Sequence, residues 1–313
     1  MLRAVSRFLV LLSFVAVGAA SAQDGKFVYK QEPFDEAIYR TTAKLSQSQT
    51  IAGMKIATEF NTTEVSRRSC EEIDKDGNFK VRLDNKALHV KGEISMLGTY
   101  EYDSKKTERE SGTMLAGALN PVFDCLNGGG YSYMLTPRGE VTKVTGFADL
   151  FGDSLKENQV GAQFAGGGSD EAARTEIMQK YVHFPDKALS PGDTWEHDYA
   201  FTLPGIGKIK GRRSYKYAGD ETKDGRKLAK VTFTDSTTVE VDLKSDVSTA
   251  KGTLTTSSSS GEALFDAEAG RVVSLSNKAE LAGSLSISVG GMDLTIDQTQ
   301  TQEAKVELLD KLP

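Results

Sequence analysis

Histidine, cysteine and tryptophan are scarce in this chain of 313 residues, which has three histidines, two cysteines and one tryptophan. No HExxH pattern and no paired-cysteine motif occurs, so the sequence contains no recognisable metal site. A G-x-S-x-G nucleophile motif and a complete dinucleotide-binding glycine motif are missing as well. We therefore expect a protein without catalytic activity, metal or cofactor.

Long hydrophobic runs are also missing, except at the N-terminus. Arg3 and Arg7 form a positively charged region before a short apolar segment over residues 8–17. Ala20-Ser21-Ala22 after it fits a small-residue cleavage site. A membrane-spanning helix needs about 20 apolar residues, so this segment is too short. It predicts a signal peptide, with an uncleaved anchor or an internal helix as the alternative. We expect an exported protein, periplasmic or extracellular, with no membrane-spanning segment after cleavage.

The charge balance is acidic, with 44 Asp and Glu against 38 Lys and Arg and a net charge of −6. Non-specific nucleic-acid binding depends on neutralising phosphates with Lys and Arg, so this composition argues against a nucleic-acid partner. The two cysteines are Cys70 and Cys125. In an oxidising compartment they predict one disulfide, and two buried free thiols are the alternative.

Alternating apolar and polar residues are the strongest structural pattern. Residues 285–289 alternate Leu, Ile and Val with serine, and residues 292–297 continue the alternation after Gly290-Gly291. A two-residue turn there would pair Val289 with Met292 and Leu285 with Ile296, which places every apolar side chain on one face. The same reasoning pairs Ile51 with Met54 in an earlier hairpin. Residues 253–260 also alternate and predict a strand, with a disordered serine linker as the alternative.

A helical period appears in the middle of the chain. Four apolar residues follow the i, i+3, i+4, i+8 spacing of a surface helix: Phe147, Leu150, Phe151 and Leu155. A second helix is predicted after a cap at Ser169 or Asp170. A shorter helical face over residues 114–122 is expected to end near Pro121. The following segment, residues 181–195, contains two prolines and predicts a hinge, after which Trp195 opens a strand.

These patterns predict an α+β protein that is mainly β. Its architecture is expected to be a large curved antiparallel sheet or half-barrel, with two helices inserted between two β-rich halves. The expected segments are a signal peptide over 1–22, a first β-rich half over 23–146, a helical connector packed on the sheet over 147–184, and a second β-rich half over 185–313. Residues 23–313 are expected to form one continuous domain.

Four short segments carry a resemblance to a known family. They are FPDKALSPGDTW (184–195), YEYDS (100–104), TPRGEVTKVTG (136–146) and FDAEAGRV (265–272). Together they resemble an uncharacterised family of exported bacterial proteins, defined only as a domain of unknown function, over about residues 39–308. The general pattern is also similar to the half-barrel of periplasmic lipoprotein carriers. The resemblance implies an architecture and no catalytic residue.

Two surfaces are candidate binding sites. An apolar ligand such as a lipid is expected to contact the helix and hairpin residues Phe147, Phe151, Leu285, Ile287, Met292 and Leu294, which ordinary core packing would explain equally well. A basic stripe would suit an anionic partner, or else a solvated edge strand: Lys208, Lys210, Arg212 and Lys216. The functional prediction is a carrier or binding protein for an apolar or amphipathic ligand. The alternative is a structural or protein-interaction module of the cell envelope without a ligand.

Overall fold

The computed structural model describes residues 25–108, 111–152, 168–203, 207–244, 248–289 and 292–313. The predicted signal peptide lies outside these residues. Within them, twelve strands form one antiparallel sheet in the order β6-β5-β3-β2-β1-β12-β11-β10-β9-β8-β7, with β4 paired to β3. The strands are β1 (Glu36–Ile51), β2 (Met54–Ile73), β3 (Phe79–Ile94), β4 (Gly98–Asp103), β5 (Gly130–Leu135), β6 (Val141–Thr145), β7 (Thr194–Leu203), β8 (Gly207–Lys223), β9 (Arg226–Lys244), β10 (Ser248–Asp266), β11 (Arg271–Val289) and β12 (Met292–Leu309).

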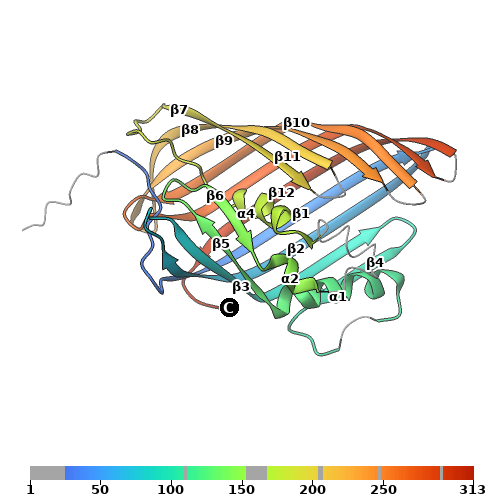
Figure 1. The fold of residues 1–313 in the computed structure, drawn as a ribbon, viewed down its shortest axis with the longest axis horizontal. Helices are drawn as coiled ribbons and strands as arrows, with labels where there is room; N and C mark the ends of the chain where they lie inside the picture. The colour runs from blue at the N-terminus through green and yellow to red at the C-terminus, as the bar shows by residue number, and fades with distance from the viewer. Residues whose placement is uncertain (1–24, 109–110, 153–167, 204–206, 245–247, 290–291) are drawn as a thin grey trace, which may run out of the picture.

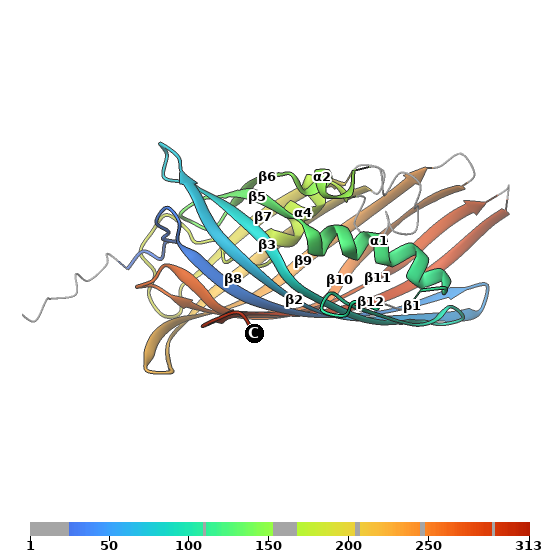
Figure 2. The ribbon, with the colours of Figure 1, turned by 90° about the horizontal axis from the view of Figure 1, so that it is seen from below.

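The first and last strands pair in the middle of this sheet. β1 and β12 run antiparallel from Ile38 opposite Leu309 to Ile51 opposite Ile296. The strands before and after the helical connector therefore belong to one continuous surface. Figures 1 and 2 show that this surface curves along its length into a half-barrel, with an inner concave face and an outer convex face. The prediction of a mainly β protein with a large curved antiparallel sheet is confirmed.

The predicted hairpin registers are also confirmed. Val289 pairs with Met292, Ile287 with Leu294 and Leu285 with Ile296, so Leu285, Ile287, Leu294 and Ile296 share one face. Ile51 pairs with Met54 at the β1–β2 turn. Residues 253–260 lie within β10 and pair with β11, so the serine-rich segment is a strand and not a linker.

Three helices lie on the concave side of the sheet, among the described residues: α1 (Met114–Gly128), α2 (Phe147–Phe151) and α4 (Asp170–Met178). α4 begins as predicted, because the Ser169 hydroxyl accepts a hydrogen bond from the Ala172 amide. α4 packs against both β6 and β7, the strands at the two ends of the sheet order. It therefore bridges the two edges that the sheet leaves open.

α1 is longer than predicted, and α2 is short within the described residues. α1 does not end near Pro121 but continues to Gly128 with the proline inside it. Its apolar side extends past the proline, since Phe123 packs on the rings of Tyr100 and Tyr102, and this packing offsets the lost backbone hydrogen bond. α2 is short and ends at Phe151. The predicted continuation of α2 to Leu155 lies outside the described residues.

An aromatic core fills the end of the half-barrel at which the described chain begins. The segment 181–195 runs through it, and Phe184 is fully buried against Phe265 and Tyr29. Trp195 opens β7, as predicted, and donates a hydrogen bond from its indole to the His183 carbonyl at 2.6 Å. The segment predicted to be a hinge thus contributes five buried side chains to this core, while residues 186–188 and 190–192 are exposed.

The predicted disulfide is wrong, because Cys70 and Cys125 are both free thiols. Cys70 is buried near the end of β2, where its thiol lies 3.6 Å from the Glu72 carbonyl oxygen. Cys125 lies in the last turns of α1, packed against the edge of the same core. Both cysteines pack with the apolar side chains of this core and act as small apolar residues.

Candidate ligand-binding cavity

A cavity of about 340 Å³ opens on the concave face between α4 and the central strands; we call it the inner cavity. Its apolar wall is formed by side chains that alternate inward along β1, β2, β3, β11 and β12, together with one residue of α1: Leu45, Phe60, Val90, Leu275, Val306 and Phe123. The closing pairing of β1 with β12 brings the two halves of this wall together. Small residues at Ala43 and Ala304 leave the space open between them.

A second cavity of about 250 Å³ adjoins the first along the same face. The two share Gln179, Asn277, Gln302 and Ala304 in their linings, so they form one groove beneath α4. Its walls combine apolar side chains with hydroxyl and amide groups from β9 to β12, including Val239, Leu254, Leu281, Thr237 and Gln300. The groove thus offers both apolar contact and hydrogen-bonding groups.

A buried lysine marks the charged side of the inner cavity. Lys180 is only 5% exposed, and its ammonium lies 3.1 Å from Glu176 and 3.8 Å from Glu64. Burial alone would lower the pKa of Lys180, but the two carboxylates outweigh it and hold the pKa above its ordinary value. Lys180 is therefore a permanent cation beside an apolar wall.

A buried ion pair lines the second cavity. Arg213 on β8 donates two hydrogen bonds to Asp235 on β9, at 2.7 and 3.0 Å, and stacks over the Phe233 ring. Burial would lower the pKa of Arg213, but Tyr215 and Asp235 raise it, so Arg213 stays charged. Because its charges are matched, this pair can contact a polar group without requiring a charged ligand.

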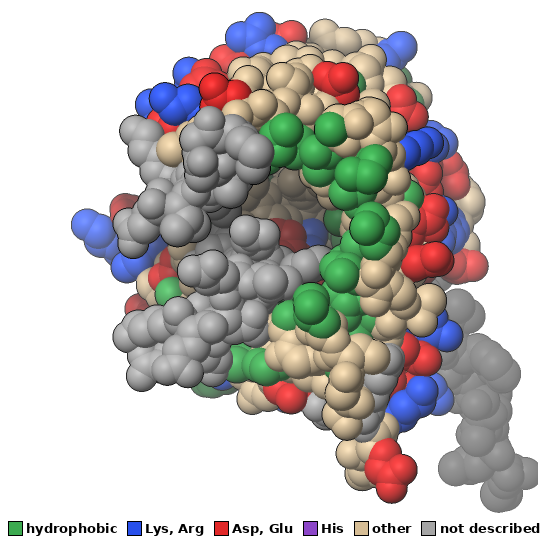
Figure 3. Space-filling view, turned by 90° about the vertical axis from the view of Figure 1, so that its right-hand side faces the viewer, with side chains coloured by type: hydrophobic (Ala, Val, Ile, Leu, Met, Phe, Trp, Pro, Cys, Tyr) green, Lys and Arg blue, Asp and Glu red, His purple; other side chains and the backbone are tan. Residues whose placement is uncertain are grey.

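Apolar side chains dominate the far end of the groove. Leu254, Leu285 and Ile296 form a buried cluster there, with Ile51, Val239, Val241, Leu281 and Ile287 packed against it. Figure 3 looks along the molecule at this end and shows a hollow with hydrophobic side chains on its rim and charged groups deeper inside. The groove therefore changes from charged and polar inside to apolar at the mouth.

The residues predicted to face a ligand do not all lie at this groove. Phe147 and Phe151 are buried in the aromatic core, where they contact Tyr131 and each other. Leu285 and Ile287 belong to the apolar cluster at the mouth, and Leu294 is 37% exposed beyond it. The side chain of Met292 lies outside the described residues. Sequence reasoning missed Phe60, Phe123 and Lys180, because their common location depends on the β1–β12 pairing and on how α4 packs.

The predicted basic stripe lies on the outer face of β8, where Lys208, Lys210, Arg212 and Lys216 are all exposed. Two of the four are paired: Lys210 with Glu240 at 3.3 Å, and Arg212 with Asp198 at 2.6 Å. β8 is also not an edge strand, because β7 and β9 flank it. The stripe is thus a partly neutralised outer surface.

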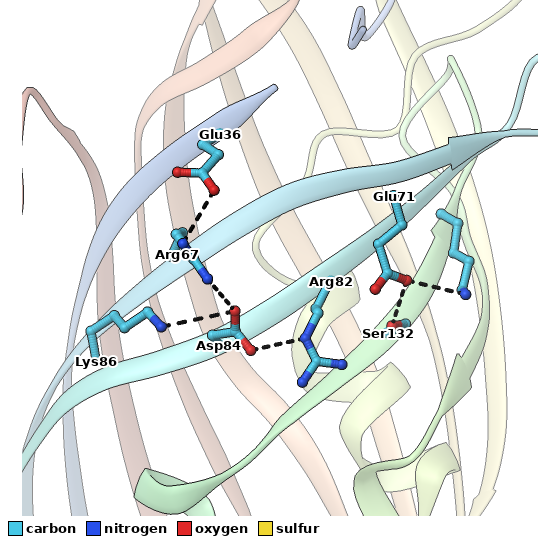
Figure 4. A network of polar contacts seen from close by, with 8 residues as sticks. Glu36, Arg67, Glu71, Arg82, Asp84, Lys86 and Ser132 are labelled. Carbon is cyan, nitrogen blue, oxygen red and sulfur yellow. Dashed lines mark hydrogen bonds and ion pairs between the residues drawn. The ribbon is translucent and has the colours of Figure 1, made fainter. Parts of the chain in front are cut away.

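A larger hollow of about 700 Å³ lies on the outer face of β1, β2, β10, β11 and β12. Its lining is polar and charged, with Asn61, Lys278, Glu303 and Lys305 among its members. Figure 4 shows a neighbouring part of the outer face, where Arg67 joins Glu36 at 3.2 Å and Asp84 at 3.0 Å. These ion pairs connect β1, β2 and β3 across the outer face. The outer hollow itself lacks the apolar wall of the inner cavity.

The histidines form one unexpected contact. His183 and His197 stack with ring centroids 4.0 Å apart, although the first precedes β7 and the second lies within it. Burial, and secondarily the His197 and Arg138 charges, lowers the pKa of His183 to about 4. Among the residues that the structure describes, no group of three His, Cys, Asp or Glu side chains could hold a metal ion.

The fold defines a β-rich half-barrel protein with a groove on its concave face. Residues 76–308 match a family of unknown function, DUF6263, and the chain belongs to this family. No match is found among curated proteins. Within the described part of the chain, no helix has the length and apolar character needed to cross a bilayer.

Three solved structures are partly similar to this chain. Lipovitellin, studied for its lipid–protein interactions, is 8% identical and matches 90% of this chain with a TM-score of 0.39, and the chain spans 25% of its length. A Bacteroides fragilis protein with a YmcC-like fold is 10% identical, over 91% of this chain and 100% of its own, with a TM-score of 0.26. An outer membrane channel from Pseudomonas putida is 6% identical, over 90% and 97%, with a TM-score of 0.23. These scores are too low to carry an argument about function.

Proposed function

We propose that the protein is an exported, non-catalytic carrier that holds an apolar or amphipathic ligand in the groove beneath α4. The inner cavity carries this proposal, because about 340 Å³ is within the range of small-molecule sites and its wall is mostly apolar. A packed structural module would fill this space with side chains, since protein interiors are close-packed. The short apolar leader supports export.

The distribution of polar groups favours an amphipathic ligand over a simple hydrocarbon. Lys180 and the amides of Gln179 and Gln302 lie within the groove, whereas the mouth is apolar. A ligand with a polar head could place that head near Lys180 and its tail along Leu254 and Ile296. The polar head could then hydrogen-bond to these groups, whereas a purely apolar ligand would remove water from them without replacing its hydrogen bonds.

The first test is native mass spectrometry of the protein purified from its own host. A co-purifying small molecule or lipid is the expected result. A clean mass of the chain alone, with specific protein partners, would contradict the carrier and favour an envelope interaction module. A lipid-like dye such as anilinonaphthalene sulfonate then provides a quantitative assay on the delipidated protein.

A blocking variant locates the binding site. Ala304 lines both cavities, so Ala304→Phe should fill the groove and lower dye binding by about tenfold. Thr299→Phe is the matched control, because it adds the same ring to the same strand at an exposed outward position. Equal dye binding by both variants would place the ligand elsewhere.

A further inference from the structure

Exposed apolar side chains gather at the mouth end of the half-barrel. Met54 is at the β1–β2 turn, Met96 and Leu97 are at the β3–β4 turn, and Met114 is the first residue of α1. Their exposed fractions are 62% for Met54, 86% for Met96, 49% for Leu97 and 77% for Met114. We call these four residues the apolar tips. Exposed apolar groups that cluster in one region mark an interaction surface more often than scattered ones do.

Backbone contacts place two of these turns side by side. The Ser95 amide donates to the Ala57 carbonyl at 2.8 Å, and the Ala57 amide donates to the Ser95 hydroxyl at 3.1 Å. The β3–β4 turn therefore lies beside β2, three residues from Met54. Ile51 pairs with both Met54 and Ile296, so the tips continue directly into the apolar cluster that lines the mouth.

The two turns that carry Met54, Met96 and Leu97 differ in charge from turns at the opposite end. The turns at the mouth end, Ala52-Gly53 and Ser95-Met96-Leu97, carry no charged residue. Described turns at the opposite end are rich in charge: residues 74–78 read DKDGN, and residues 223–226 read KDGR. Charged turns keep one end hydrated, whereas uncharged apolar turns can enter a bilayer interface at low cost.

We propose that the mouth end docks on a lipid bilayer surface by inserting the apolar tips. Separate turn tips that carry flexible Met and Leu side chains need no shape-complementary partner, which suits a fluid surface. A protein interface would instead favour aromatic residues and arginine at its centre, and none occurs in these two turns. Because the tips are uncharged, the interaction does not require anionic lipids.

This inference goes beyond the proposed carriage of a ligand, since docking can occur with the groove empty. Docking would also affect how a ligand enters the groove, because the apolar tips and the mouth share one apolar surface. A ligand could pass between bilayer and groove without crossing water. If the dye does not bind, the carrier proposal is contradicted. Docking on vesicles is tested separately, by flotation.

The experiment is flotation of the secreted chain with neutral phosphatidylcholine vesicles, after mass measurement has confirmed that the leader is removed. The wild type should float with the vesicles, and high salt should not release it. Met96→Ser with Leu97→Ser should lower the partition coefficient by about tenfold or more. Met54→Ser, at the other turn, should lower it independently.

The matched control is Phe34→Ser. Phe34 is 84% exposed and has a positive φ of 72°, much like Met96 with 86% and 74°, but it precedes β1 at the opposite end. Its partition should equal that of the wild type, and denaturation curves should show that every variant folds. Equal loss in Phe34→Ser, release by salt, or no flotation of the wild type would overturn the proposal. A dimer that the Met96 variant dissociates, without flotation, would assign the tips to a protein contact instead.

Discussion

Tyr39 on β1 donates a hydrogen bond from its hydroxyl to the Val272 carbonyl on β11, 3.1 Å away and 233 positions further along the chain. The guanidinium of Arg68 lies 4.1 Å above the same ring. Burial raises the pKa of Tyr39 to about 12, against the opposing charge of Arg68, so the hydroxyl stays protonated and remains a donor. One side chain thus connects the first strand, the second strand and the C-terminal half.

Tyr39→Phe tests this connection. The ring and its contact with Arg68 remain, but the hydroxyl is lost and the buried Val272 carbonyl loses a donor. The free energy of unfolding should fall by about 1 kcal/mol. Urea denaturation measures it, and Tyr39→Leu should cost more because the ring contact is lost as well. An unchanged midpoint for Tyr39→Phe would mean that the carbonyl finds another partner.

Two adjacent arginines allow a comparison between the faces of the sheet. Arg213 faces inward and pairs with Asp235; the Arg213 side chain is 5% exposed and that of Asp235 is 9% exposed. Arg212 faces outward and pairs with Asp198. Asp235→Ala should destabilise the fold by roughly 3–5 kcal/mol, because it leaves a buried cation unpaired. Asp198→Ala should leave the denaturation curve within its error, since solvent screens exposed pairs. Similar losses in both would contradict the burial assigned to Arg213.

The stacked histidines predict a dependence of stability on pH. The pKa of His183 is lowered from about 6.5 in the unfolded chain to about 4 in the folded one, so the unfolded state binds more protons between these values. Stability is complete above pH 6.5 and is lost as the pH falls toward 4, by about 2 kcal/mol from His183 at pH 5.

Denaturation at pH 7 and pH 5 measures this loss, and His183→Gln should reduce the difference between the two curves. A His183 variant with the same pH dependence as the wild type would assign the acid sensitivity to other groups.

Thiol labelling checks the free cysteines. The unfolded chain should take up two labels without reductant, which a disulfide would prevent. In the folded protein Cys125 should react first, because Cys70 is buried and burial raises the pKa of its thiol. A folded chain that loses two mass units on oxidation and takes up no label would show that the thiols can pair after all.

Much of the fold could be predicted because strand alternation is a local signal. The Leu285–Ile296 hairpin follows from its apolar period and from Gly290-Gly291, and the start of α4 follows from the Ser169 cap. The pairing of β1 with β12 could not be predicted, since no turn connects these strands. α1 was predicted too short because tertiary packing by Phe123 outweighs the local effect of Pro121.

The groove was harder to predict than the sheet. An inward strand position has the same pattern in the sequence whether a helix covers it, as α2 covers Tyr131, or leaves space above it, as at Phe60. Which one applies depends on the path of α4 and of the segment that follows it. The cysteines show the same limit, because spacing along a chain does not measure the distance between two thiols.

The position of β12 has a consequence for biogenesis. β12 follows the other described strands in the sequence but lies in the middle of the sheet, so one edge of β1 stays unpaired until β12 has been made. Until then the backbone groups at this edge lack strand partners, which slows folding and favours aggregation. Removing the eighteen residues of β12, Met292–Leu309, would therefore divide the sheet into two rather than shorten it at an edge.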